Sequence, residues 1–135
     1  MSLSSKQIGQ TGEDLAAKFL KKKGFKVLVK NFSTRFGEID LIVVKKDLLV
    51  FVEVKTRVGD GELNPEWAIN WEKIKRVEKM AQVFLAQNKI NYQNLRIDAV
   101  CVSLNPEGKL LRLDHYENLS YEFHVHPRGG HGYFT

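Results

Sequence analysis

The segments GEIDLIVV (residues 37–44) and VFVEVKTR (residues 50–57) decide the fold of this chain. Both alternate in the manner of a β-strand, in which successive side chains point to opposite faces. The alternation places Phe51, Glu53 and Lys55 on one face of the second strand. Large apolar residues lie on both faces of both segments, and this pattern predicts a sheet that is covered on both sides.

The carboxylates within these apolar strands are the first functional signal. Acidic side chains are rare in buried strands unless they are paired or bind a metal. Asp40 and Glu53 fall near the open ends of the two strands, and Lys55 follows on the face of Glu53. Two converging carboxylates suit Mg²⁺ or Mn²⁺, and a lysine beside them can stabilise charge on a phosphate that is being cleaved. Without a metal, the same three residues would form a strand-end ion-pair network, and this alternative stays open.

The face of the first strand follows from the same alternation. We expect Glu38 and Asp40 to lie on one face, opposite Ile39, Leu41 and Val43. The short polar turn after residue 44 then joins the two strands as a hairpin.

The two segments resemble a known signature. GEIDLI followed by VFVEVKTR is similar to the D-x(n)-E-x-K pattern of the PD-(D/E)XK nuclease superfamily. More closely, the chain resembles the small bacterial UPF0102 family, also called YraN-like, whose members are predicted endonucleases similar to archaeal Holliday-junction resolvases. The resemblance covers about residues 8–104, including GQTGEDLAAKFL (residues 9–20), Asn31, NPE (residues 64–66) and KIKR (residues 73–76).

The resemblance implies a role for several residues. It implies that Asp40 and Glu53 bind the metal and that Lys55 is the catalytic lysine. We expect the Val54 carbonyl, next to Glu53, as a further metal ligand. It implies that Glu13 completes the metal site or positions a second metal. Glu38 matches a family position to which no role is assigned. The implied architecture is the restriction-endonuclease-like α/β fold, a mixed central β-sheet flanked by helices on both sides.

Basic residues near these strands are candidate phosphate contacts. Arg35 and Arg57 flank the two strands, and Lys73 and Arg76 belong to a predicted helix. An arginine fork matches the geometry of a phosphate, although each of these residues could equally be a solvated surface charge. The formal net charge of +5 and the pI of about 9.3 favour binding to a polyanion such as nucleic acid, and the resemblance implies that this nucleic acid is DNA.

The rest of the chain predicts a single α/β domain over residues 1–120, followed by a flexible tail over residues 121–135. We expect helices over residues 8–22 and 65–88, a loop over 57–64, and strands over 25–30, 36–44, 48–56, 95–104 and 109–113. By pattern alone, Glu13 is an acid near the start of its helix, where the helix dipole favours a negative charge. Asp98 is expected to form a local ion pair with Arg96.

The cysteine and hydropathy patterns bear on localisation. Cys101 is the only cysteine and lies in an apolar run, so we expect a core residue rather than a nucleophile. A lone cysteine forms no internal disulfide, which favours a reducing, cytoplasmic location. No apolar stretch approaches the roughly 18 residues needed to cross a bilayer, and no signal-peptide pattern is present, so no membrane partner is expected.

Together these patterns predict a metal-dependent endonuclease that hydrolyses phosphodiester bonds in DNA, with branched or junction DNA as a candidate substrate. Resolvases cut two strands symmetrically, which favours a homodimer. The main alternative is a nucleic-acid-binding protein on the same fold that cleaves weakly or not at all. RNA in place of DNA is an open variant of the first hypothesis.

Overall fold

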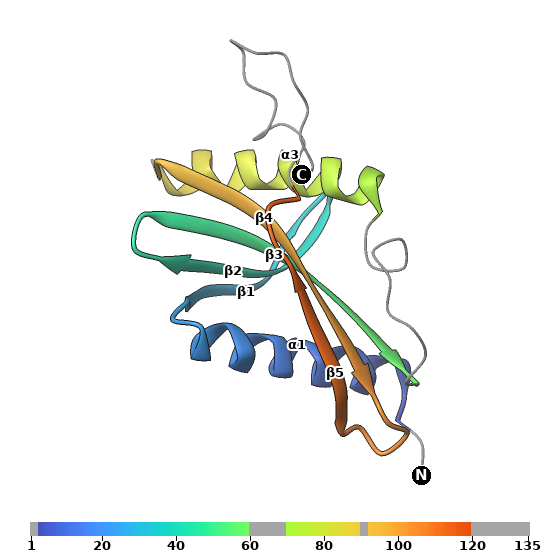
Figure 1. Cartoon of the computed structure of the whole chain (residues 1–135). Helices are drawn as coiled ribbons and strands as arrows, with labels where there is room; N and C mark the ends of the chain where they lie inside the picture. The colour runs from blue at the N-terminus through green and yellow to red at the C-terminus, as the bar shows by residue number, and fades with distance from the viewer. Residues whose placement is uncertain (1–2, 60–69, 90–91, 120–135) are drawn as a thin grey trace.

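A mixed β-sheet between two helices forms the body of the molecule (Figure 1). The structure, a computed structural model, describes residues 3–59, 70–89 and 92–119. Along the described chain the elements are α1 (Ser5–Lys22), β1 (Lys26–Thr34), β2 (Gly37–Lys45), β3 (Leu48–Val58), α3 (Trp71–Asn88), β4 (Asn94–Leu104) and β5 (Leu110–Tyr116). The strands lie side by side in chain order; β3 and β4 are parallel, and the other neighbours are antiparallel. The predicted α/β fold, with a mixed sheet and helices on both sides, is confirmed.

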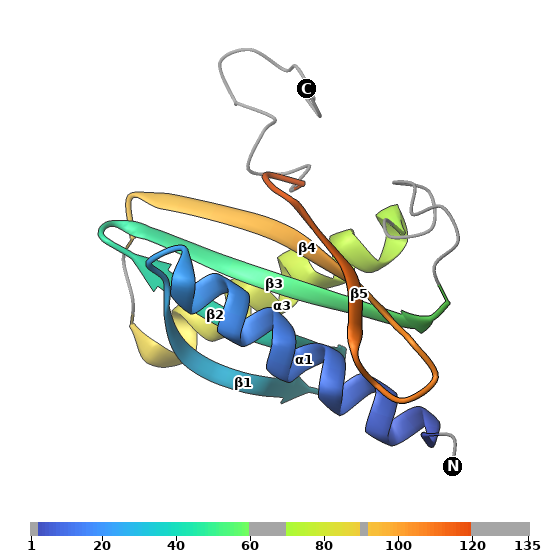
Figure 2. The ribbon, with the colours of Figure 1, turned by 60° about the horizontal axis from the view of Figure 1, so that its bottom comes forward.

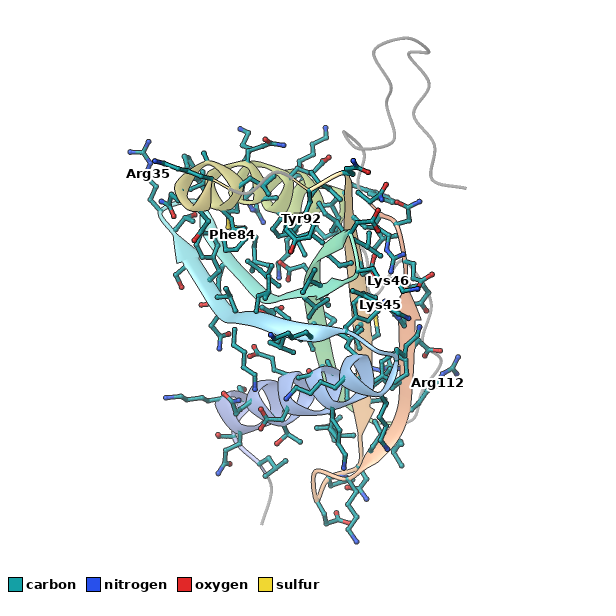
Figure 3. The ribbon with its side chains drawn as sticks, turned by 90° about the vertical axis from the view of Figure 1, so that its left-hand side faces the viewer. Arg35, Lys45, Lys46, Phe84, Tyr92 and Arg112 are labelled. Atoms are coloured by element: carbon teal, nitrogen blue, oxygen red, sulfur yellow. The ribbon has the colours of Figure 1, made fainter. Side chains whose placement is uncertain are left out.

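Each face of the sheet buries its own hydrophobic core. On the α3 side the core includes Phe51 and Phe84, whose rings meet edge to face at a centroid distance of 6.0 Å. Figure 3 shows Phe84 between α3 and the sheet. On the α1 side the core includes Leu20, Val50 and Val52. The predicted separation of Phe51 from Val50 and Val52 is therefore confirmed, because β3 is a regular strand.

Helix α1 begins earlier than the apolar pattern indicates. The Ser4 side chain accepts a hydrogen bond from the Gln7 backbone N–H (3.1 Å), and the Gln7 side chain accepts one from the Ser4 N–H (2.8 Å). This reciprocal capping box fixes the start of the helix at Ser5. Glu13 consequently lies in the middle of the 18-residue helix, and no acid occupies the first turn. The explanation of Glu13 by the helix dipole is therefore wrong.

Several other boundaries differ from the predicted ones. Strand β1 continues to Thr34 rather than ending at residue 30. Strand β3 continues to Val58, so Arg57 belongs to a strand and not to a loop. Helix α3 begins at Trp71, after Asn70, whose side chain accepts from the first backbone N–H groups of the helix. Residues 57–59 apart, the predicted loop lies outside the described residues, as do the first five residues of the predicted helix over 65–88 and the tail over 121–135.

The pairing of β1 with β2 is irregular around Asn31 and Asp40. Asn31 has a left-handed backbone (φ 54°), and β2 pairs with β3 only from Leu41 onward. Ile39 consequently packs in the α3-side core together with Ile42, whereas Leu41 packs on the α1 side. The prediction that Ile39 shares a face with Leu41 is therefore wrong, because the strand does not keep strict alternation through Asp40.

Neither of the helices in the described part of the chain has the length and apolar character needed to cross a membrane.

Candidate functional site

Asp40 lies at the point where β2 and β3 separate. The pairing of the two strands ends at Leu41 opposite Val52, one residue away from Asp40. Beyond that point the Val54 N–H of β3 donates its hydrogen bond to the Asp40 side chain, at 2.7 Å from Oδ2, and not to the backbone of β2. The side chain is half-buried and held between two central strands. A carboxylate is thus fixed at an opening in the sheet, as the sequence predicts.

Two further acids converge on Asp40. Glu13 from α1 and Glu38 from β2 each bring a carboxylate oxygen into a group with Asp40 in which all three oxygens lie within 4.8 Å of one another. The Asn31 side-chain amide, with its nitrogen toward the acids, donates to Glu13 Oε1 (3.1 Å) and Glu38 Oε1 (2.9 Å). Ser33 Oγ also donates to Glu38, at 3.2 Å. We call Glu13, Glu38 and Asp40 the acidic cluster.

Glycine at position 12 lets Glu13 reach this cluster. A Cβ at Gly12 would lie 1.8 Å from Oγ1 of Thr56, an impossible distance for two heavy atoms that are not bonded. Helix α1 can therefore pack closely against β3 only without a side chain here. Because Glu13 is the next residue, this close approach carries its carboxylate toward the open ends of the central strands.

The acids of the cluster raise the proton affinity of Glu13. Burial is the largest cause of the raised pKa of Glu13, followed by the negative charges of Asp40 and Glu38. The hydrogen bond from Asn31 acts in the opposite direction but does not cancel them. A positive charge placed among these acids would relieve the same repulsion.

Glu53 approaches Asp40 from the other face of the sheet. The residue is only 7% exposed, and neither carboxylate oxygen accepts a well-aligned hydrogen bond from the described residues. Lys73 of α3 places its Nζ 3.0 Å from Glu53 Oε2, as an ion pair. Burial and then the charge of Asp40 raise the pKa of Glu53 to about 8, and Lys73 only partly opposes them. This buried carboxyl therefore favours a proton or a cation.

The donor set fits a hard divalent cation. Every side-chain donor in the acidic cluster and at Glu53 is a carboxylate oxygen, the ligand type that Mg²⁺ and Mn²⁺ prefer. Glu38, to which the sequence assigned no role, belongs to the acidic cluster. Glu53 is not a member of the cluster, but it interacts electrostatically with one of its members, Asp40. The Val54 N–H contacts Asp40, and the role of the Val54 carbonyl stays a prediction.

Lys55 lies two residues beyond Glu53 near the end of β3. Its side chain is exposed, and it makes no ion pair with any residue that the structure describes. It is paired in register with Cys101 of β4. The predicted core position of Cys101 is confirmed, because its side chain is fully buried and burial raises the pKa of its thiol to about 12.

The four candidate phosphate contacts occupy different surroundings. Lys73 faces Glu53, whereas Arg76 is exposed on α3. Arg57 is half-buried in β3. Figure 3 shows Arg35 at the turn between β1 and β2, pointing away from the sheet, with its guanidinium carbon 5.1 Å from the centre of the Phe36 ring. Lys73 thus contacts a predicted site acid, Glu53.

A second polar cluster is formed by residues of β4 and β5 around the buried Asp98. Arg96 donates twice to Asp98 (2.9 and 3.0 Å), which confirms the predicted ion pair. His115 Nε2 lies 2.8 Å from Asp98 Oδ2, and the Asn118 N–H donates to Oδ1 at 3.0 Å. Burial alone would raise the pKa of Asp98, but the hydrogen bonds from His115, Arg96 and Asn118 outweigh it and hold the pKa below the usual range. These partners satisfy Asp98, so it serves the fold rather than the acidic cluster.

Two residues of the site were not identified as functional from the sequence. Asn31 was noted only as a matching position, yet it bridges Glu13 and Glu38. The signal was an asparagine inside an otherwise strand-forming segment, since asparagine tolerates a left-handed backbone better than most residues. Glu38 shares a strand with Asp40 two residues away, and that spacing was the available signal.

The fold and the site define a class: an α/β protein whose central strands separate around a cluster of carboxylates with a lysine beside it. The chain belongs to the uncharacterised protein family UPF0102, the YraN-like family, whose profile matches residues 12–102. It is 41% identical over 117 residues to the UPF0102 protein of Caldanaerobacter subterraneus subsp. tengcongensis, covering 86% of this chain and 96% of that protein. It is 36% identical over 116 residues to the UPF0102 protein of Dictyoglomus turgidum, covering 86% of this chain and 98% of that protein. The predicted family is thereby confirmed, and the names of the relatives state no activity.

Proposed function

We propose that this protein is a metal-dependent endonuclease that hydrolyses phosphodiester bonds in DNA. One observation carries the proposal: the buried Glu53 and the acidic cluster meet at Asp40 in a gap between central strands. Concentrating acids in this way raises the pKa values of Glu13 and Glu53, which disfavours the metal-free, ionised state. Repulsion between acids does not stabilise the fold, whereas a cation site needs several carboxylates close together.

The carboxylates would hold Mg²⁺ or Mn²⁺. Asp40 and Glu53 are the principal ligands in this proposal, Glu13 completes the site, and Glu38 and the Val54 carbonyl are further oxygen donors. The ion would supply positive charge that polarises the phosphate and acidifies an attacking water. The chain's part is to fix the carboxylates before the ion arrives, through the Val54 N–H on Asp40 and the Asn31 amide on Glu13.

Lys55 would serve the phosphate rather than the metal. Its exposed ammonium group extends from the same face of β3 as Glu53 and is not neutralised by any described acid. A cation in that position can donate hydrogen bonds to phosphate oxygens and stabilise the negative charge that develops on them during cleavage. It can also orient the water that attacks the phosphorus.

Lys73 would change partner between the empty and loaded states. In the metal-free protein its Nζ lies 3.0 Å from Glu53 Oε2, and its side chain remains 42% exposed. With a cation bound at Glu53, the Lys73 ammonium would be available to a substrate phosphate. Its predicted role as a phosphate contact is therefore compatible with its ion pair. Arg57, Arg76 and Arg35 remain the other proposed phosphate contacts, and the net charge of +5 favours the encounter with DNA.

The proposal is tested by cleavage of labelled duplex, single-stranded, flapped and four-way-junction DNA, with matched RNA as a comparison. Wild type is compared with Lys55→Ala and with Lys46→Asn, which removes one positive charge at the opposite end of β3 and suits the left-handed backbone there. We expect cleavage that Lys55→Ala abolishes and Lys46→Asn retains. Equal cleavage by wild type and Lys55→Ala would remove Lys55 from the mechanism.

A second candidate function is nucleic-acid binding without cleavage. The specific observation in its favour is the Lys73–Glu53 ion pair, which already places a positive charge beside this buried site acid without a metal. This function predicts DNA binding that weakens with added salt and is unchanged by EDTA or by Lys55→Ala. The predicted homodimer and the cytoplasmic location remain proposals.

A further inference from the structure

A cavity of about 350 Å³ lies beside the acidic cluster, between α1 and the end of β3. Figure 2 shows α1 lying across the sheet, with its N-terminal half toward that end of β3. Ile8, Gly9 and Glu13 are among the lining residues from α1, and Thr56, Arg57 and Val58 are among those from β3. Because Glu13 belongs to both the cavity and the acidic cluster, a molecule in the cavity would lie next to the proposed cleavage centre.

Gly9 is the feature that points to an occupant. A glycine inside a helix costs about 1 kcal/mol relative to alanine, so its presence needs a reason. At Gly12 the reason is packing, because a Cβ there would collide with Thr56. At Gly9 a Cβ would meet no described atom within 4 Å, and the backbone is not left-handed. Gly9 lines the cavity, and the absence of a side chain at this position keeps the cavity open.

The walls of the cavity indicate the chemistry of that occupant. Ile8, Val54 and Val58 provide apolar surface, Ser5 and Thr56 carry hydroxyl groups, and Arg57 carries a positive charge. The volume is at the lower end of the range for small-molecule sites and is too small for a duplex. Apolar walls suit the faces of a base, hydroxyl groups suit its polar edge, and a guanidinium suits a phosphate. A single nucleotide combines these three requirements.

We propose that this cavity binds one unpaired nucleotide of the substrate strand, adjacent to the phosphate at the acidic cluster. The proposal rests on the proposed function in taking the ligand to be nucleic acid. It deepens that function by naming a substrate class, namely DNA with an unpaired nucleotide at the cleavage position. A fully paired base would first have to leave the helix stack, at a cost of a few kcal/mol, so intact duplex is the poorer ligand.

The test compares two fluorescein-labelled duplexes that differ only in one extra, unpaired nucleotide. Their affinities are measured by fluorescence anisotropy, in EDTA and again with Ca²⁺ in place of Mg²⁺. We expect wild type to bind the bulged duplex about tenfold more tightly than the paired one, a difference of ~1.4 kcal/mol. Gly9→Leu, which places a side chain in the cavity, should abolish this preference and leave affinity for the paired duplex unchanged. The control Gln10→Leu adds a similar side chain at the neighbouring exposed position and should retain the preference.

Thermal unfolding separates a filled cavity from a damaged fold. Since Gly9 has no described packing partner, Gly9→Leu and Gly9→Ala should both raise the melting temperature. The proposal is overturned if wild type shows no preference in either buffer, if Gly9→Leu keeps it, or if Gly9→Leu lowers the melting temperature. A preserved preference without metal-dependent cleavage would refute the proposed function alone. Cleavage without any preference would refute this inference alone.

Discussion

Replacing Glu53 by glutamine should stabilise the metal-free protein at alkaline pH. Glutamine keeps the shape of the side chain but cannot ionise, so it removes the one property that makes this buried position unfavourable. The residue is 7% exposed and lies against Asp40, with the half-exposed Lys73 as its counter-ion. An acid whose only role is its ion pair would behave in the opposite way, because its loss would leave a cation without a partner.

The magnitude follows from the pKa of Glu53, which burial and Asp40 raise from 4.5 to about 8. Folded protein therefore binds a proton more tightly than unfolded protein, and the stability of the wild type falls as pH rises from 4.5 to 8. Each pKa unit corresponds to ~1.4 kcal/mol, and pH 7 lies about 2.5 units above the unfolded pKa, so holding the folded carboxyl protonated costs about 3 kcal/mol at pH 7. We expect Glu53→Gln to unfold with a free energy about 3 kcal/mol higher than wild type at pH 7 and about 4 kcal/mol higher at pH 8, and with a nearly equal one near pH 4.5.

Urea unfolding followed by circular dichroism, in EDTA from pH 4.5 to 8.5, measures this difference. Glu107→Gln is the matched control, since it removes the same charge from an exposed turn. Adding Mg²⁺ or Mn²⁺ at pH 8 should then stabilise wild type and have a smaller effect on Glu53→Gln, because binding to the folded state adds to its stability. The reasoning is refuted if Glu53→Gln is the less stable protein at pH 8 and metal changes neither. That result would establish Glu53 and Lys73 as a structural ion pair.

Three further substitutions test the parts that support the site. Gly12→Ala should lower the free energy of unfolding by about 1–3 kcal/mol through overpacking against Thr56, as measured in urea. Asp98→Asn should lower it by about 3 kcal/mol because it breaks a buried network. Since the pKa of Asp98 is lowered, this advantage of the wild type should be present at neutral pH and disappear as pH falls below the usual aspartate value. Lys73→Met should raise the pKa of Glu53 further, so that stability in EDTA keeps falling above pH 8, where the fall in wild type levels off; an unchanged end point of this fall would contradict the ion pair.

Regular segments were predictable from the sequence. Alternation placed Phe51 opposite Val50 and Val52 correctly, because β3 keeps one backbone geometry along that stretch. It failed at Ile39, because the left-handed Asn31 and the separation of the strands at Asp40 change the face of the chain. The alternation of apolar residues in the sequence does not predict such a local backbone change.

The start of α1 shows a signal that was present but not used. Ser4 followed three residues later by Gln7 is the pattern of a capping box, and it identifies the helix start better than the first apolar residue does. With the start at Ser5, Glu13 moves from the first turns to the middle of the helix. Its position near the acids then needs a functional reason rather than the helix dipole.

The candidate site was only partly predictable. The sequence identified Asp40, Glu53 and Glu13, and the structure brings these residues together. The contact between Lys73 and Glu53 joins α3 to β3 and depends on how the helix packs on the sheet. No local pattern contains that information. The same holds for the cavity beside Gly9, which exists only once α1 lies against β3.

Metal-dependent cleavage by wild type and by Asp40→Asn is the most direct test of the central claim. Asp40 joins the acidic cluster to Glu53, and asparagine can still accept the hydrogen bond from the Val54 N–H, so the variant should stay folded. We predict that wild type cuts DNA with Mg²⁺ or Mn²⁺ and not with EDTA, and that Asp40→Asn, folded by circular dichroism, does not cut under any of these conditions. Cleavage in EDTA, cleavage by Asp40→Asn, or salt-sensitive DNA binding by wild type without any cleavage would contradict the account.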